Sequence, residues 1–243
     1  MQTAEQLLLL ERPPQVAAGL DFSVLTPRGW YDDVSGFDKD DGMGGFTPVT
    51  ADNNSFRRWR DRSGNAKHLV QLTIPGNSPK YKQAFVGGKD AAYINIAEQF
   101  GVSMTRTRPE TIFLVLKMND TGGEIIDGAP GGNNGRLFAY ASAPFAPLSL
   151  YAGSGLAAPA FASGAWKYLT CVLNGAQSKI RVNGVEVAGD IGTDVGTMLT
   201  LGSNFGVLMN GYIAALVVCP GVVSAQNIAA AEAGFKAYYG QWS

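Results

Sequence analysis

The densest group of chemically capable side chains lies in RRWRDRSGNAKHL, residues 57 to 69. Four arginines, an aspartate and the single histidine of the chain, His68, surround Trp59 there. Such a segment could be an active site, a phosphate-binding site, or only the turn between two strands. A phosphate site would need a glycine cradle at the start of a helix, which this stretch lacks. His68 has no serine or cysteine motif near it and no second histidine, so we predict a structural role for it.

Glycoside hydrolysis would need two facing carboxylates, about 5.5 Å apart in a retaining enzyme. On a strand, only acids at i and i+2 or i+4 share a face. Glu124 and Asp127 are three apart, so we expect them to point oppositely, and Glu186 stands alone in a hairpin. Asp190 and Asp194 flank a glycine loop, and no HExxH, nucleophile-elbow, Walker or GxGxxG motif is present. We therefore predict that the protein is not an enzyme.

A metal site is suggested by one acidic stretch, FDKDDGMGG at residues 37 to 45. Asp38, Asp40 and Asp41 precede Gly42 and offer hard oxygens on a loop, as Ca²⁺ prefers. The EF-hand spacing is not met, because the third acid is one place early and no glutamate closes the loop. A solvated turn is the favoured interpretation, and calcium is the one cofactor that the sequence suggests.

A glycan surface would combine aromatic rings with amides, and residues 133 to 155 supply both. The candidate glycan-binding residues are Asn133, Asn134, Tyr140, Phe145 and Tyr151. Alternating aromatic residues in a β-sandwich also serve as core, so both interpretations stay open.

The bulk composition excludes two classes of protein. The chain of 243 residues has a net charge of −1, whereas nucleic-acid-binding proteins carry a clear basic excess. No apolar run approaches the ~20 residues that cross a bilayer.

The leucines of MQTAEQLLLLERPP lack the basic region of a signal peptide, so we expect synthesis in the cytoplasm without secretion. Cys171 and Cys219 lie in apolar runs and are expected as buried thiols, with a disulfide as the alternative.

Strand patterns dominate the remainder of the chain. Residues 111–118, 167–173, 198–204 and 211–220 are apolar runs of strand length. Residues 178–189 alternate around Asn183-Gly184, which is typical of a hairpin with a type I′ turn. A helix is predicted over 224–240, with an N-cap at Ser224, a stop at Gly240 and one face made by Ile228, Ala231, Phe235 and Tyr238. Many short strands with terminal helices indicate a two-sheet sandwich.

The first 20 residues read differently from the rest. Residues 3 to 11 form a short predicted helix that ends before Pro13-Pro14. Helices under ~12–15 residues are marginal alone, yet this one carries four consecutive leucines. We predict an attachment arm over residues 1–20 and a sandwich domain over 21–243. The arm would bury its leucines against other subunits or copies of itself, and the alternative is that it folds back onto its own domain.

Three segments in order resemble the concanavalin A-like, laminin G-like jelly rolls: WRDRSGNAKHLVQ (59–71), WKYLTCVLNGAQSKIRVNGVEV (166–187) and the run from Leu199 to Gly240. The resemblance implies an all-β fold, a two-sheet antiparallel jelly-roll sandwich with a short N-terminal helical arm and a C-terminal helix. It also implies that Trp59 and Trp166 are core anchors. The residues that follow Trp59 would form a turn capped by side chains, made by Asp61, Ser63, Gly64 and Asn65.

Domains of this family are common in bacterial surface proteins and tailed-phage particles. We therefore expect a non-catalytic adhesion or structural module on the surface of a virion or phage-like particle, as a fibre, spike or decoration protein. Its expected partners are other particle subunits through the arm, including copies of itself, and a host cell-surface glycan. No nucleic acid and no membrane insertion are expected. The alternatives are a jelly-roll glycosidase and a purely structural virion subunit that binds no sugar.

Overall fold

The protein folds as two packed antiparallel sheets with one C-terminal helix, which confirms the predicted all-β sandwich. This computed structural model describes residues 21–72, 78–95, 98–120, 123–128, 136–139 (backbone only), 148–202 and 209–240. The predicted arm, residues 1–20, lies outside the described residues. No helix in the described ranges is long and apolar enough to cross a membrane.

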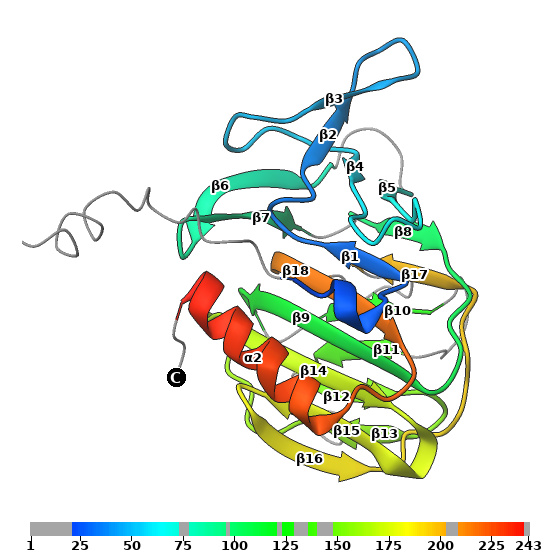
Figure 1. The fold of residues 1–243 in the computed structure, drawn as a ribbon. Coiled ribbons are helices and arrows are strands. Elements are labelled where there is room, and N and C mark those ends of the chain that lie inside the picture. Colours follow the sequence, from blue (N-terminus) through cyan, green and yellow to red (C-terminus); the bar gives the residue numbers. More distant parts are fainter. Residues whose placement is uncertain are drawn as a thin grey trace, which may run out of the picture.

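The helix α2 (Ala225–Tyr239) lies along the outer face of one sheet, which we call the helix-covered sheet (Figure 1). Its strands run in the spatial order β16 (Val185–Gly189), β15 (Ser178–Val182), β14 (Lys167–Leu173), β9 (Glu110–Met118), β18 (Gly211–Pro220), β7 (Lys89–Ile94) and β6 (Lys80–Val86). The short β1 (Gly29–Tyr31) pairs with the later part of β18. Strands β9, β14 and β18 read as continuous apolar runs because both faces of the sheet are buried there.

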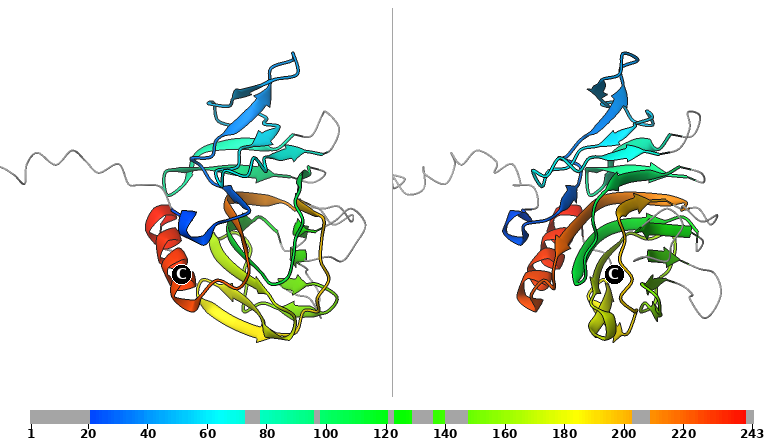
Figure 2. Two further views of the ribbon diagram at one scale, coloured as in Figure 1. Left: turned by 45° about the vertical axis from the view of Figure 1, so that its right-hand side comes forward. Right: turned by 90° about the vertical axis from the view of Figure 1, so that its right-hand side faces the viewer.

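The second sheet closes the other side of the core. Its strands run in the order β13 (Gly155–Ala157), β12 (Ser149–Tyr151), β11 (Arg136–Ala139), β10 (Gly123–Asp127), β17 (Met198–Leu201), β8 (Phe100–Ser103), β5 (Leu69–Gln71), β4 (Arg58–Trp59), β2 (Phe37–Asp40) and β3 (Phe46–Pro48). The β2–β3 hairpin extends away from the body of the molecule (Figures 1 and 2). Two short 3₁₀ helices, η1 (Ser23–Leu25) and η2 (Gly175–Gln177), complete the described elements.

Two hydrophobic clusters hold these layers together. The larger lies between the sheets, where Trp59 is 1% exposed and stacks on Phe37 at 4.9 Å between ring centroids. The smaller lies between the helix-covered sheet and α2, around Phe113 and Phe235. Successive side chains of a β-strand point to opposite faces of the sheet, so the central strands contribute residues to both clusters.

The C-terminal helix begins and ends where its sequence predicts. The Ser224 hydroxyl accepts a hydrogen bond from the Asn227 N–H at 3.2 Å, and Gly240 ends the helix at a φ of 110°. Ile228 and Phe235 are buried as expected, but Tyr239 takes the buried position that we predicted for Tyr238. The Tyr239 hydroxyl donates to a carbonyl of β18, which fixes the last turn against the sheet.

The strongest local patterns were predicted correctly. Strands β9, β14 and β18 cover the predicted apolar runs, and β17 covers residues 198–201 of the predicted run 198–204, of which 203 and 204 lie outside the described residues. Strands β15 and β16 form the hairpin around Asn183 and Gly184, which both have positive φ. Cys171 and Cys219 are free, buried thiols, as expected. Cys171 faces the core between the sheets and Cys219 faces α2, so the two thiols lie on opposite faces of one sheet.

Candidate functional site

The arginine-rich stretch is a structural turn capped by a carboxylate, as predicted. Asp61 Oδ1 accepts hydrogen bonds from the N–H groups of Trp30 and Ser63 at 2.9 and 2.8 Å. Asp61 Oδ2 accepts from the Lys67 N–H at 2.9 Å and from the Ser63 hydroxyl at 2.7 Å. His68 Nδ1 accepts the Asp61 N–H at 3.0 Å, so the imidazole is held by the backbone in a structural role.

The arginines of this stretch are engaged with aspartates. Their ion pairs are Arg57 with Asp40 at 3.7 Å, Arg58 with Asp38 at 2.7 Å, Arg60 with Asp38 at 3.5 Å, and Arg62 with Asp32 at 2.5 Å. Because each guanidinium already faces a carboxylate, the stretch is not a set of open cations for a phosphate. Trp59, in its middle, is a core anchor as expected.

The three aspartates proposed for calcium are already bonded within the protein. Asp38 is buried and paired with two arginines, whereas Asp40 and Asp41 accept backbone N–H bonds from Gly42, Met43 and Gly45 in an exposed turn. In the parts of the chain that the structure describes, no cluster of three His, Cys, Asp or Glu side chains could hold a metal. The calcium site stays a prediction from sequence.

The predicted glycan residues fall mostly outside the described ranges. Asn133, Asn134, Tyr140 and Phe145 lie there, so the structure does not test them. Tyr151 is half-buried in β12, where it pairs across the ladder with Arg136 and Gly155.

The orientation expected for Glu124 and Asp127 is wrong, because β10 contains a bulge. The register with β11 shifts between Glu124 and Ile126, and both Ile125 and Ile126 lie in the core between the sheets. With two consecutive residues facing inward, the acids before and after them share the outer face of the second sheet. Both carboxylates are buried, Glu124 at 4% and Asp127 at 0% exposure.

An unpredicted group of aromatic side chains lies on the outer face of the helix-covered sheet. Tyr212 of β18 is directly opposite Tyr93 of β7, with the ring centroids 4.7 Å apart. Phe85 of β6 stacks on Tyr212 at 4.4 Å, and Trp166 lies 6.2 Å from both Phe85 and Tyr212. We call Phe85, Tyr93, Trp166 and Tyr212 the aromatic row.

The strand order explains why these rings meet. Neighbours of Tyr93 and Tyr212 along their strands, such as Ile94 and Ile213, face the core, so the tyrosines face outward. Lys117 of β9 pairs with Tyr212, and the register of β14 on β9 places Trp166 opposite Lys117. The row from Trp166 to Tyr93 therefore crosses three strand spacings, or ~14 Å.

The aromatic row is open to solvent beyond the last turn of α2. Phe85 is 38% exposed, and Tyr93, Trp166 and Tyr212 are half-buried. Trp166 was expected as a core anchor, but it is only partly buried and packs against the edge of the outer cluster. The α2 backbone comes close to this region at Gly87, two residues from Phe85, where a Cβ would lie 2.3 Å from the Tyr239 carbonyl oxygen.

Polar groups surround the aromatic row. The Lys117 ammonium lies 5.8 Å from the centroid of Tyr212 and 6.0 Å from that of Phe85. The Lys82 ammonium lies 6.0 Å from the centroids of both Phe85 and Tyr93. At the rim, Asn119 donates to Asn210 Oδ1 at 2.9 Å, and Asn210 donates to Asp120 at 3.0 Å. Rings, ammonium groups and amides thus converge on one surface.

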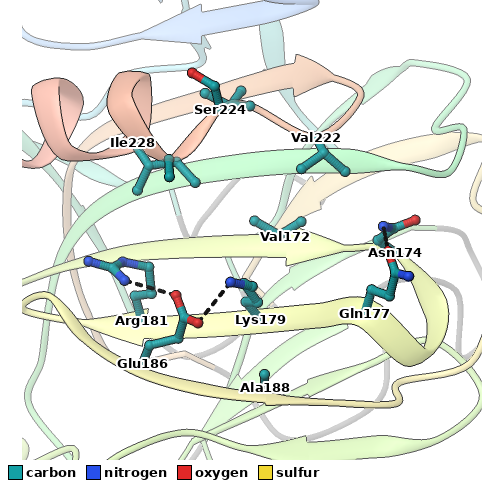
Figure 3. Close-up of a pocket in the computed structure, with 12 residues that line it drawn as sticks. Val172, Asn174, Gln177, Lys179, Arg181, Glu186, Ala188, Val222, Ser224 and Ile228 are labelled. Atoms are coloured by element: carbon teal, nitrogen blue, oxygen red, sulfur yellow. Dashed lines mark hydrogen bonds and ion pairs between the residues drawn. The ribbon is translucent and has the colours of Figure 1, made fainter.

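A pocket of about 630 Å³ lies on the same face of the sheet, at the other end of α2 (Figure 3). Its floor and wall are apolar, with Val172, Val222 and Ile228, and its opposite side carries Glu186 between two cations. Glu186 is 2.9 Å from the Lys179 ammonium and 2.8 Å from the Arg181 guanidinium.

The charges of this pocket oppose acid catalysis. The hydrogen bond from Lys179, helped by that from Arg181, holds the pKa of Glu186 below its usual value. Arg181 is also bonded to the buried Glu232 of α2 at 2.8 Å, and its pKa is raised by that contact. A lowered pKa favours the ionised carboxylate, whereas a general acid must hold a proton, and Glu186 is the only acid among the pocket-lining residues described.

Comparisons with known proteins define the fold class. No protein-family model matches the chain, and no curated protein matches it in sequence. Domain 4 of AbnA, a GH43 extracellular arabinanase from Geobacillus stearothermophilus solved with arabinotriose, has a TM-score of 0.56 at 17% identity, over 85% of this chain and 98% of that one.

Two further structures are similar over most of this chain. A GH54 α-L-arabinofuranosidase has a TM-score of 0.64 at 11% identity, over 88% of this chain and 63% of that one. The binding domain of botulinum neurotoxin DC, in complex with SialylT, has a TM-score of 0.51 at 11% identity, over 86% and 55%. Identities this low show the fold alone, which is a concanavalin-like two-sheet β-sandwich without assignment to a specific family.

Proposed function

We propose that this protein is a non-catalytic glycan-binding module and that the aromatic row is its binding surface. The observation that carries the proposal is the contact between the rings of Trp166, Tyr212 and Tyr93, which come from the β14, β18 and β7 region of one sheet face, and the 38% exposed ring of Phe85. One face of a sugar ring presents C–H groups that pack favourably on the negative face of an aromatic ring. The rim amides and ammonium groups supply donors for hydroxyl and ring oxygens.

The dimensions of the surface favour a chain of sugars over a single ring. Residues on adjacent strands are ~4.8 Å apart, so the row extends across the sheet instead of enclosing one small ligand. Phe85, Tyr93 and Tyr212 lie on β-strands, which hold their side chains in fixed relative positions. The similar arabinanase domain was solved with an oligosaccharide, which agrees with this proposal.

The adhesion part of the proposal rests on the sequence. A particle-surface protein would be attached through residues 1–20, whose leucines need a partner surface. Directly after that segment, Phe22 packs on Trp30, Phe113 and Phe235 at centroid distances of 5.3 to 5.7 Å.

A glycosidase is the second candidate, and the bulge in β10 favours it. Glu124 and Asp127 share one face of the second sheet and are both buried, as a pair of catalytic carboxylates would be. Changing each acid to its amide would separate the two candidates. A hydrolase would lose turnover of its polysaccharide in either E124Q or D127N, whereas a binding module shows no turnover to lose.

A glycan array probed with the full chain tests the primary proposal. The expected result is retention of a defined group of oligosaccharides by the wild type and loss of that signal in F85A. The matched control is F46A, because Phe46 is similarly exposed, at 41% against 38% for Phe85, and lies on the β2–β3 hairpin. Equal binding by F85A and the wild type would contradict the assignment of the surface.

A further inference from the structure

The lysines beside the aromatic row differ from the arginines of the arginine-rich turn in whether they form ion pairs. The arginines near Trp59 face carboxylates, but no ion pair within the described ranges includes Lys82 or Lys117. Lys82 donates to the side-chain oxygen of Asn53, and both ammonium groups lie near Phe85.

The acids on neighbouring segments are engaged elsewhere. Asp52 Oδ1 accepts the Gln83 N–H at 3.0 Å, and Asp120 accepts a hydrogen bond from Asn210. Both carboxylates keep their negative charge, but within the described ranges neither forms an ion pair with Lys82 or Lys117, so the positive charge of each ammonium group has no paired carboxylate there. A ligand that supplied an anion beside its packed sugar face would satisfy that charge.

We propose, building on the glycan-binding function above, that the aromatic row selects an acidic glycan. Its sugar rings pack on the solvent-facing parts of Phe85, Trp166 and Tyr93, and an anionic substituent, either a uronate carboxylate or a sulfate, pairs with Lys117 or Lys82. Lys117 is the main determinant, because it lies within the row itself, between Trp166 and Tyr212 in the strand register. Lys82 lies at the end of the row, beside Tyr93.

The test compares an acidic glycan with its neutralised form. Dissociation constants of the full chain are measured by calorimetry for oligogalacturonate, for its methyl ester, and for a sulfated galactose oligosaccharide. We expect tighter binding of at least one acidic ligand than of the ester. One exposed charge pair is worth about two- to fivefold in affinity, so K117Q should lose about that factor, and K82Q/K117Q about tenfold.

The control and the salt dependence isolate the charge. K39Q removes an exposed lysine of β2 and should bind like the wild type. The preference for the acidic ligand should shrink as salt rises, because the Debye length falls from ~10 Å at 0.1 M to ~3 Å at 1 M and an exposed charge pair is then screened. A sulfated ligand that binds while oligogalacturonate does not would identify sulfate as the anion.

Two outcomes would overturn the inference and are distinguishable. If the ester binds as tightly as the acid, or if a neutral glycan is retained on the array while both anionic ligands fail, the acidic preference is wrong and the glycan-binding function stands. If neither the array nor the calorimetry detects any glycan, the proposed function fails with it.

Discussion

Lys117 and Tyr212 face each other across the β9–β18 pair, with the ammonium 5.8 Å from the ring centroid. This pairing places a charge and a ring on one row of the sheet, and neither residue is near the other in sequence. A Lys ammonium within ~6 Å of a ring is attracted to its negative face. The contact therefore orders Lys117 above the sheet, where an incoming ligand would meet it.

Trp59 should be a major determinant of stability. Its ring is 1% exposed, stacks on Phe37, and donates from Nε1 to the Asp32 carbonyl at 3.0 Å. W59A should lower the free energy of unfolding by about 3–5 kcal/mol. Urea denaturation provides the measurement, and W166A is the matched control with a smaller expected loss, because Trp166 is only partly buried. Equal losses in both variants would refute the placement of the two rings.

Arg106 and Arg108 should differ in their contributions although both contact Glu110. Arg106 and Glu110 are fully buried and paired at 2.6 Å, so R106M should cost about 3–5 kcal/mol by leaving the carboxylate poorly compensated. Burial lowers the pKa of Arg108 to about 10, and its Nε and Nη2 have no hydrogen-bond partner among the residues that the structure describes. R108M should therefore cost much less. A larger loss for R108M in urea titrations would reverse the assignment.

Glu98 should make stability depend on pH in an identifiable direction. Burial raises the pKa of this carboxyl, although the Asn95 N–H donates to it at 2.8 Å. A raised pKa penalises the folded state once the carboxyl ionises, so its contribution favours folding at low pH and is lost as pH rises through the folded pKa. E98Q should raise the Tm at neutral pH and have little effect below about pH 4, near the unfolded pKa of Glu. A pH-independent change in Tm would contradict this explanation.

Removal of residues 1–16 should alter assembly and not the stability of the sandwich. The domain is anchored at Phe22 by contacts with three aromatic rings, which the deletion leaves intact. We expect an unchanged Tm and a smaller species in light scattering or size-exclusion chromatography. A truncated protein that assembles normally but melts much lower would show that the arm folds back onto its own domain.

The fold was predictable from sequence where the determinants are local. The Asn183-Gly184 turn and the apolar runs of β9 and β18 specify their elements without reference to distant residues. The bulge in β10 was not visible, because nothing in GEIID marks which isoleucine is the extra residue. That single residue reversed the predicted relation between Glu124 and Asp127.

The aromatic row could not be found from sequence for a topological reason. Tyr93, Trp166 and Tyr212 are separated by dozens of residues, and only the order β14-β9-β18-β7 brings them into contact. Each of these residues in isolation reads as an ordinary aromatic of a β-strand. The sequence signal that could have indicated the row is an aromatic residue at one end of each apolar run, as with Trp166 and Tyr212. The strand order is still needed to show that these residues meet.

The most direct test of whether the aromatic row binds glycan uses calorimetry. It measures the affinity of the wild type, F85A, Y212A and F46A for a glycan identified on the array. We expect F85A and Y212A to lose binding by at least tenfold while circular dichroism shows an intact fold, and F46A to bind like the wild type. If F85A and Y212A remain folded and bind the glycan with wild-type affinity, the aromatic row is not the glycan-binding surface.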